Sequence, residues 1–182
     1  MICSPPIFFT ATFSWVFRKM LWGFNYARPS LQERLGLSRE DIEASAVFDA
    51  GRRAAMLTSE LYEELLPRES PTALPFGFEE LNLRLDNAYG HLALPGDPLS
   101  FRPAPAKPLQ SSMLFSYLGI SGIFIPFTGE PSVNALQPDV ALPMVVAHEK
   151  AHQRGITHEG EATFAAFLAC AQPANTTYFR YA

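Results

Sequence analysis

The chain has 182 residues, a length that suits one domain with its own hydrophobic core. Hydrophobic residues make up 48% of it and charged residues 18%, which excludes an intrinsically disordered chain. The net charge of -4 and the absence of a basic stripe argue against nucleic acid as a partner.

An apolar stretch at residues 7–24 opens the chain and is interrupted by Arg18 and Lys19. Its uncharged first run is shorter than the roughly 20 apolar residues that span a bilayer. The whole stretch can lie in or on a membrane if both cations reach the interface. The alternative is a buried or amphipathic helix of a soluble domain. We therefore expect residues 1–24 to be a membrane-associated apolar segment and residues 25–182 to be the folded domain.

Two helices are predicted in the first half of this domain. Apolar residues recur with helical spacing over residues 42–66, with Ser38 as a candidate cap and Pro67 as the stop. A second helical stretch covers residues 78–92. The proline-rich residues 94–108 then predict an extended connection.

The middle of the chain has the composition of strands. Residues 114–127 combine β-branched and aromatic side chains with glycines, and Pro126 indicates a strand edge or end. Residues 128–131 predict a turn, and residues 132–135 a short second strand. The pattern as a whole predicts an α+β fold that is mostly helical with a small β-sheet.

Two helices are expected to close the chain. Pro143 suits the first turn of one helix, which extends to about residue 154, where Gly155 can end it. Thr157 is a candidate cap for the next helix, over residues 158–171.

The first of these helices carries an HExxH pattern formed by His148, Glu149 and His152. Residues four apart share one face of a helix, so both imidazoles can bind one zinc ion. Glu149 lies beside that face, where it can take a proton from water and pass it to a leaving amine. The alternative is a pair of solvated histidines on a helix surface.

A catalytic zinc site needs a third protein ligand and an open position. Glu159 in the first turn of the following helix is the favoured candidate, ahead of Glu161 and His158. Thr163 shares the face of Glu159 and can hydrogen-bond a metal ligand. For either glutamate the alternative is a favourable charge at a helix N-terminus.

Substrate contacts are less clearly marked in the sequence. A peptide can bind as an added strand at a sheet edge, and residues 132–135 precede the zinc helix at a suitable distance. Asn134 is therefore the predicted substrate contact, with an ordinary loop residue as the alternative. Tyr178, Arg180 and Tyr181 are candidate oxyanion donors because they follow the second helix.

Four blocks carry a resemblance to a known family: WGFNYARP at residues 22–29, GISGIFIPFTGE at 119–130, HEKAHQRG at 148–155 and EGEATF at 159–164. With these blocks in order, nearly the whole chain resembles the bacterial domain-of-unknown-function family thirty-eight-ten. Its members are membrane-anchored, gluzincin-like HExxH proteins. The resemblance implies a minimal gluzincin (zincin-like) fold, in which the HExxH helix packs on a glutamate helix. It also implies longer members, so this chain is expected to be partial, with truncation at its C-terminus.

The glutamate helix of gluzincins reads Glu-x-x-Ala-Asp or Glu-x-x-Ala-Asn, and its first glutamate is the metal ligand. The resemblance places that ligand at Glu159 and the alanine at Ala162, with Thr163 where the group has Asp or Asn. A hydroxyl orients a ligand histidine less firmly than a carboxylate does. Metal affinity or turnover is therefore expected to be reduced.

These features predict a zinc metallopeptidase that hydrolyses peptide bonds through a zinc-activated water, with Glu149 as general base. Its expected partners are a peptide or protein substrate and, through the N-terminal segment, the cytoplasmic membrane. The resemblance favours the outer face of that membrane. One alternative is a weak or inactive zinc- or peptide-binding module of a membrane protein. Another is a membrane-associated scaffold without metal.

Overall fold

The structure is a computed structural model that describes residues 27–37, 42–68, 70, 72–92, 94, 103–172 and 176–182. The described part is α+β and mostly helical with a small sheet, as predicted, and the sheet has three strands. Its elements are α2 (Leu31–Arg34), α3 (Ala44–Leu65), α4 (Phe78–Leu92), β1 (Lys107–Pro108), α5 (Ser112–Tyr117), β2 (Gly122–Ile125), β3 (Glu130–Val133), the 3-10 helix η1 (Asp139–Ala141), α6 (Leu142–Gln153), α7 (Glu159–Cys170) and α8 (Thr177–Tyr181).

The predicted membrane segment, residues 1–24, lies outside the described residues. Within the part of the chain that the structure describes, no helix is both long enough and apolar enough to cross a membrane.

The sheet has the strand order β1-β3-β2, so β3 is its central strand and β2 is an edge. β1 runs parallel to β3, with Lys107 opposite Ser132. β2 runs antiparallel to β3, from the pair Gly122 and Val133 to the pair Ile125 and Glu130. Both sides of β3 are therefore paired. An added strand would have to bind at an edge, β1 or β2, rather than at the predicted residues 132–135.

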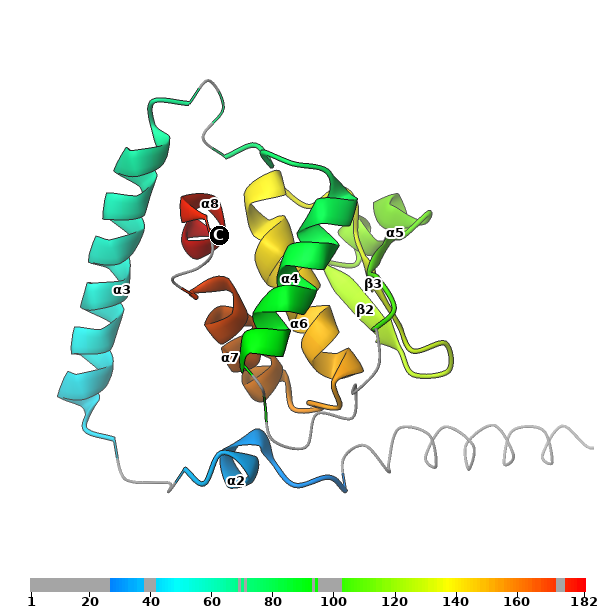
Figure 1. The fold of residues 1–182 in the computed structure, drawn as a ribbon, viewed down its shortest axis with the longest axis horizontal. Coiled ribbons are helices and arrows are strands. Elements are labelled where there is room, and N and C mark those ends of the chain that lie inside the picture. Colours follow the sequence, from blue (N-terminus) through cyan, green and yellow to red (C-terminus); the bar gives the residue numbers. More distant parts are fainter. Residues whose placement is uncertain are drawn as a thin grey trace, which may run out of the picture.

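Helix α6 lies in the middle of the core, between α4, α7 and the sheet (Figure 1). Both α6 and α7 carry fully buried alanines, and small side chains let two helices approach closely. These alanines are Ala147 and Ala151 of α6 and Ala162, Ala165, Ala166 and Ala169 of α7. This close packing brings the first turn of α7 to the face of α6 that carries the histidines.

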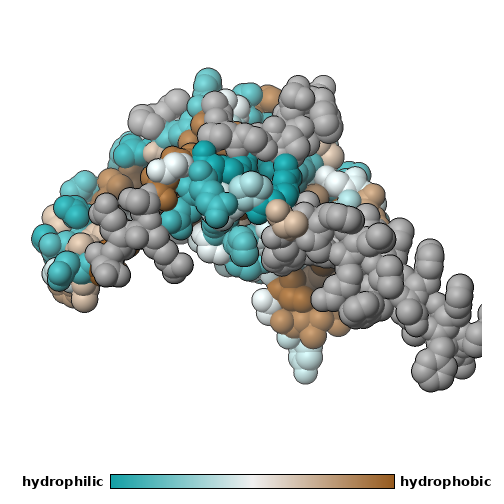
Figure 2. Space-filling view, turned by 90° about the horizontal axis from the view of Figure 1, so that it is seen from below, coloured by the Kyte–Doolittle hydropathy of each residue, from teal (hydrophilic) through white to brown (hydrophobic). Residues whose placement is uncertain are grey.

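Helix α3 confirms the helix predicted over residues 42–66, but only Leu61 and Leu65 near its end are buried. Helix α3 packs against α8, which lies between α3 and the rest of the domain (Figure 1). The same apolar side continues over Val47 and Leu57, which are exposed. At the left of Figure 2, seen from below, hydrophobic residues of α3 accordingly lie beside hydrophilic ones. The predicted cap Ser38 lies outside the described residues.

Three local predictions were wrong. The turn predicted over residues 128–131 and the strand predicted over residues 132–135 are both placed about two residues late, because β3 already begins at Glu130 and ends at Val133. Part of the stretch predicted as strand, up to Tyr117, belongs to the helix α5. Gly119 ends this helix with φ of 70°, and Ile120 donates its N–H to the carbonyl of Phe115, so the glycine closes a helix rather than bounding a strand. At the start of α7 the cap position is His158 instead of Thr157.

Candidate metal centre

The turn between α6 and α7 folds the glutamate helix back onto the HExxH helix. Gly155 has φ of 74°, its N–H binds the carbonyl of His152, and the N–H of Ile156 binds the carbonyl of Ala151. This pair of hydrogen bonds after a left-handed glycine is a Schellman ending, in which glycine avoids the Cβ penalty. Glu159 therefore begins α7 directly opposite the histidines.

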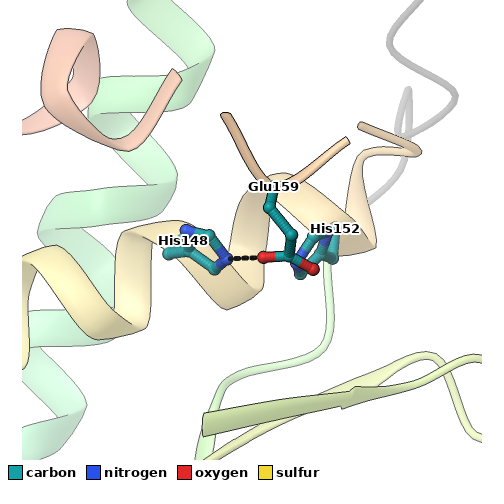
Figure 3. Close-up of side chains that lie close together, drawn as sticks. All are labelled: His148, His152 and Glu159. Carbon is teal, nitrogen blue, oxygen red and sulfur yellow. Dashed lines mark hydrogen bonds and ion pairs between the residues drawn. The ribbon is translucent and has the colours of Figure 1, made fainter. Parts of the chain in front are cut away.

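Three side chains converge between the two helices, as Figure 3 shows. His148 Nε2 lies 3.0 Å from Glu159 Oε2, and His152 Nε2 lies 3.6 Å from Glu159 Oε1. The candidate ligand atoms of all three residues lie within 4.8 Å of one another. This His/His/Glu cluster could hold a metal ion.

The carboxylate lies between the two imidazoles. His148 Nε2 and His152 Nε2 approach different oxygens of Glu159, Oε2 and Oε1, at 3.0 Å and 3.6 Å. Ligand atoms around a tetrahedral zinc at about 2.0–2.2 Å are roughly 3.3 Å apart, so small side-chain adjustments would bring these donors to one ion. Two imidazoles and one carboxylate also form the donor set of His₂Glu catalytic zinc sites, which leave one position open. His148, His152 and Glu159 would thus be the residues that hold the ion.

The second ring nitrogen of each histidine has its own partner. His152 Nδ1 lies 2.7 Å from the backbone oxygen of Ile156, which can only accept, so Nδ1 donates and Nε2 is the ring nitrogen left to bind a metal. His148 Nδ1 lies 3.3 Å from Thr163 Oγ1, a longer contact with a neutral hydroxyl. Burial, followed by the neighbouring His152, lowers the pKa of His148, which favours the neutral ring that binds metal.

A pocket of about 320 Å³ opens beside the cluster and is lined by Ser121, Gly122, Met144, Val145, His148, Glu149, Glu159 and Thr163. Glu149 is 6% exposed, and its Oε2 atom has no hydrogen-bond partner among the described residues. Burial, followed by repulsion from Glu159, raises the pKa of Glu149 to about 8. A bound cation would oppose this shift by favouring the carboxylate. The pocket therefore offers a carboxyl group with an unused acceptor next to the cluster.

The other two candidate ligands lie elsewhere. Glu161 Oε2 accepts the backbone N–H of Leu31 at 2.9 Å, so this side chain ties α2 to α7. His158 is exposed at the cap position of α7 and is not part of the cluster. Glu159 is thus the carboxylate that the structure brings to the histidines.

The structure gives Asn134 a structural role. Its side chain is fully buried, and its amide donates to Ser116 Oγ at 2.8 Å and to the carbonyl of Ile120 at 3.1 Å. Its Oδ1 accepts the N–H of Leu136 at 3.0 Å. These bonds hold the segment that leads into β2. The predicted contact between Asn134 and a substrate stays a prediction, and the residue is not in the pocket lining.

The candidate oxyanion donors belong to α8, on the side of the domain that faces α3. Tyr178 is fully buried, and its hydroxyl donates to the carbonyl of Thr72 at 3.1 Å. None of Tyr178, Arg180 and Tyr181 lines the pocket.

Sequence reasoning missed four residues of the pocket lining: Ser121, Gly122, Met144 and Val145. Gly122 had a readable signal, because a glycine within a strand pattern often marks a close approach of another group. Met144 and Val145 lie one turn before His148 on α6, where helical periodicity alone does not separate pocket from core.

Comparison with known proteins gives one match. A family model with the description "Protein of unknown function (DUF3810)" matches residues 4–182. No curated protein and no solved structure matches the chain. Because the match covers nearly its whole length, the chain belongs to this family, DUF3810.

Proposed function

We propose that this chain is a zinc-dependent peptidase with a zincin-like, gluzincin-type arrangement of its two site helices. The observation that carries the proposal is the convergence of His148, His152 and Glu159, whose candidate ligand atoms lie within 4.8 Å of one another, with Glu149 in the same pocket. The buried Oε2 of Glu149 has no hydrogen-bond partner among the described residues. A purely structural metal site would not require such a group, whereas a catalytic site requires a proton acceptor.

Within this proposal the protein side chains have separate tasks. Bound zinc would supply Lewis acidity, which polarises a scissile carbonyl and makes water more acidic. Glu149 would accept the proton of the attacking water at its unpaired Oε2 and deliver it to the leaving amine. Ile156 and Thr163 would hold the two imidazoles in the orientation that presents Nε2.

The free edge of β2 supplies a support for a peptide. Asn134 donates its N–H to the carbonyl of Ser121 at 2.8 Å, so Ser121 and Asn134 form a hydrogen-bonded pair. In an antiparallel ladder such pairs alternate with non-bonded pairs. The backbone groups of Gly122 and Phe124 therefore point to the free edge, and Pro131, which has no N–H, lies opposite Phe124. A peptide added here would pass along the pocket that Gly122 lines.

The alternative is a weak or inactive zinc- or peptide-binding module. The specific observation in its favour is Thr163, whose neutral hydroxyl lies 3.3 Å from His148 Nδ1 and holds that ring loosely. Both proposals predict bound zinc, so they are distinguished by whether the protein cleaves peptides.

Metal content, measured by mass spectrometry on purified protein, is the first test. We expect about one zinc per chain in the wild type, and loss of most of it in His148→Ala or Glu159→Gln. His158→Ala and Glu161→Gln are matched controls that should keep the metal, because neither residue belongs to the cluster. Wild-type protein that stays free of metal in the presence of zinc would refute the site and favour the scaffold alternative.

Turnover is tested with a library of quenched fluorescent peptides. Glu149→Gln should retain zinc and lose roughly a hundredfold or more in rate, because the glutamine cannot accept the proton. Cleavage by this variant at the wild-type rate would overturn the assigned base. Zinc-loaded wild type that cleaves no peptide would favour the binding module.

The membrane association remains a proposal that rests on residues 7–24 of the sequence. We propose that this segment attaches the domain to the cytoplasmic membrane, on the outer face. Protease added to intact cells should then cut the domain, and full protection would contradict this sidedness.

A further inference from the structure

Gly122, the first residue of β2, lies against the carboxyl group of Glu149. A Cβ atom at this position would lie 2.6 Å from Glu149 Oε1, 2.7 Å from its Cγ and 2.9 Å from its Cδ. Ordinary contacts between such atoms are about 3.5–4.0 Å, so a side chain here would displace the carboxyl by roughly 1 Å. Gly122 is not among the glycines with positive φ. Glycine is therefore required here by the lack of space for a side chain and not by the backbone conformation.

The edge strand cannot move away to make that space. At its start, Asn134 binds the carbonyls of Ile120 and Ser121 at 3.1 Å and 2.8 Å. Beyond its end, Gln153 of α6 donates to the carbonyl of Gly129 at 2.8 Å. Glu149 and Gln153 are four residues apart and share one face of α6, so this face contacts the hairpin at both ends.

We propose that Gly122 is a positioning residue, whose missing side chain lets the edge strand β2 lie directly on Glu149. The strand then fixes where the carboxylate meets a peptide held along the same edge. The contact itself is independent of the reaction, whereas its catalytic consequence rests on the proposed peptidase function.

The contact is tested by a double-mutant cycle in thermal unfolding. Gly122→Ala should lower the unfolding midpoint by about 5 °C or more in the wild-type background, because it overpacks the site. In a Glu149→Ala background, where Oε1, Cγ and Cδ are gone, it should lower the midpoint by less than about 2 °C. Gly90→Ala in α4 is the control, since nothing lies within 4 Å of its added Cβ. Equal losses in both backgrounds would overturn the proposal.

The catalytic consequence is tested at a temperature well below the unfolding midpoint of the variant. Gly122→Ala should keep its zinc, because none of the three candidate ligands is touched, while kcat falls roughly tenfold to a hundredfold and KM changes less. Loss of zinc together with activity, or an unchanged kcat, would contradict a positioning role. If the wild type itself cleaves no peptide, the proposed peptidase function is refuted. The double-mutant cycle in thermal unfolding then still tests whether Gly122 makes room for Glu149.

Discussion

Removal of the Asp86 carboxylate should destabilise the domain strongly, because two buried cations share it. Lys150 is fully buried and Arg154 is 3% exposed. Asp86 Oδ1 lies 2.8 Å from Lys150 Nζ and 3.2 Å from Arg154 Nη2. In Asp86→Ala both cations would remain desolvated without this counter-charge, and the ring of Tyr89, 4.2 Å from the Arg154 guanidinium, offsets little of that cost.

The expected magnitude follows from the asymmetry of buried ion pairs. Removal of one partner typically costs about 3–5 kcal/mol because it leaves a buried charge without compensation, whereas replacement of a whole buried ion pair by apolar groups of similar volume is often nearly neutral. Asp86→Ala should therefore cost about 3–5 kcal/mol, a large share of a stability of roughly 5–15 kcal/mol. Lys150→Met removes the desolvated cation and leaves Asp86 with Arg154, so it should cost less than about 1.5 kcal/mol.

Urea unfolding followed by circular dichroism gives both free energies of unfolding, and comparable m-values would show that the same structure unfolds in each variant. Glu80→Ala is the matched control on the same helix, because it removes a carboxylate from an exposed pair with Arg84 and should cost less than about 1 kcal/mol. Adding Lys150→Met to Asp86→Ala should recover part of the loss. Equal costs for Asp86→Ala and Lys150→Met would refute the reasoning.

Three further predictions concern other buried groups. Burial raises the pKa of Cys170 to about 12, so its thiolate should stay scarce up to about pH 10; in Cys3→Ser protein, Ellman's reagent should label it at pH 8 only as urea unfolds the chain. Gly155→Ala should cost about 2 kcal/mol or more in urea unfolding, because φ is 74° and the new Cβ would overlap the guanidinium of Arg28, which would have to move; a cost below about 0.5 kcal/mol would contradict this. Tyr89→Phe should cost about 1–2 kcal/mol by the same measurement, since the hydroxyl donates to a buried carbonyl at 2.7 Å, and an unchanged stability would show that this bond contributes nothing net.

The sequence was sufficient to predict elements whose signals are local. Helix α6, its glycine ending and the position of α7 followed from helical spacing and from Gly155. The same approach failed at α5, where aromatic and β-branched residues favoured strand although Gly119 forms a helix ending. A glycine can end a helix or interrupt a strand, and the surrounding residues here favoured the wrong choice.

Contacts between segments that are distant in the sequence could not be predicted from local sequence patterns. The residues next to Gly122 in the sequence do not indicate that Glu149 lies against it. The residues next to Gly155 likewise do not indicate that Arg28 lies against that glycine. The burial of Asn134 likewise depends on how residues 116–121 fold back toward β3. Such contacts are fixed by which faces pack together, and a residue pattern specifies a face without specifying its partner.

The HExxH segment shows how one helix uses successive faces for different purposes. Three overlapping pairs, each four residues apart, point in different directions around α6. His148 and His152 face Glu159, Glu149 and Gln153 contact the β2–β3 hairpin, and Lys150 and Arg154 bind Asp86 of α4. Successive pairs are rotated by about 100°, so the three interactions do not compete for space.

The two positions that the HExxH pattern leaves unspecified also have structural roles in this helix. Ala151 is fully buried in the hydrophobic core, where a larger side chain would overpack the surroundings of α6. Lys150 anchors the opposite side of the helix to α4. Lys150 and Ala151, the two residues that the HExxH pattern leaves unspecified, are therefore both part of the buried packing that holds α6 in place.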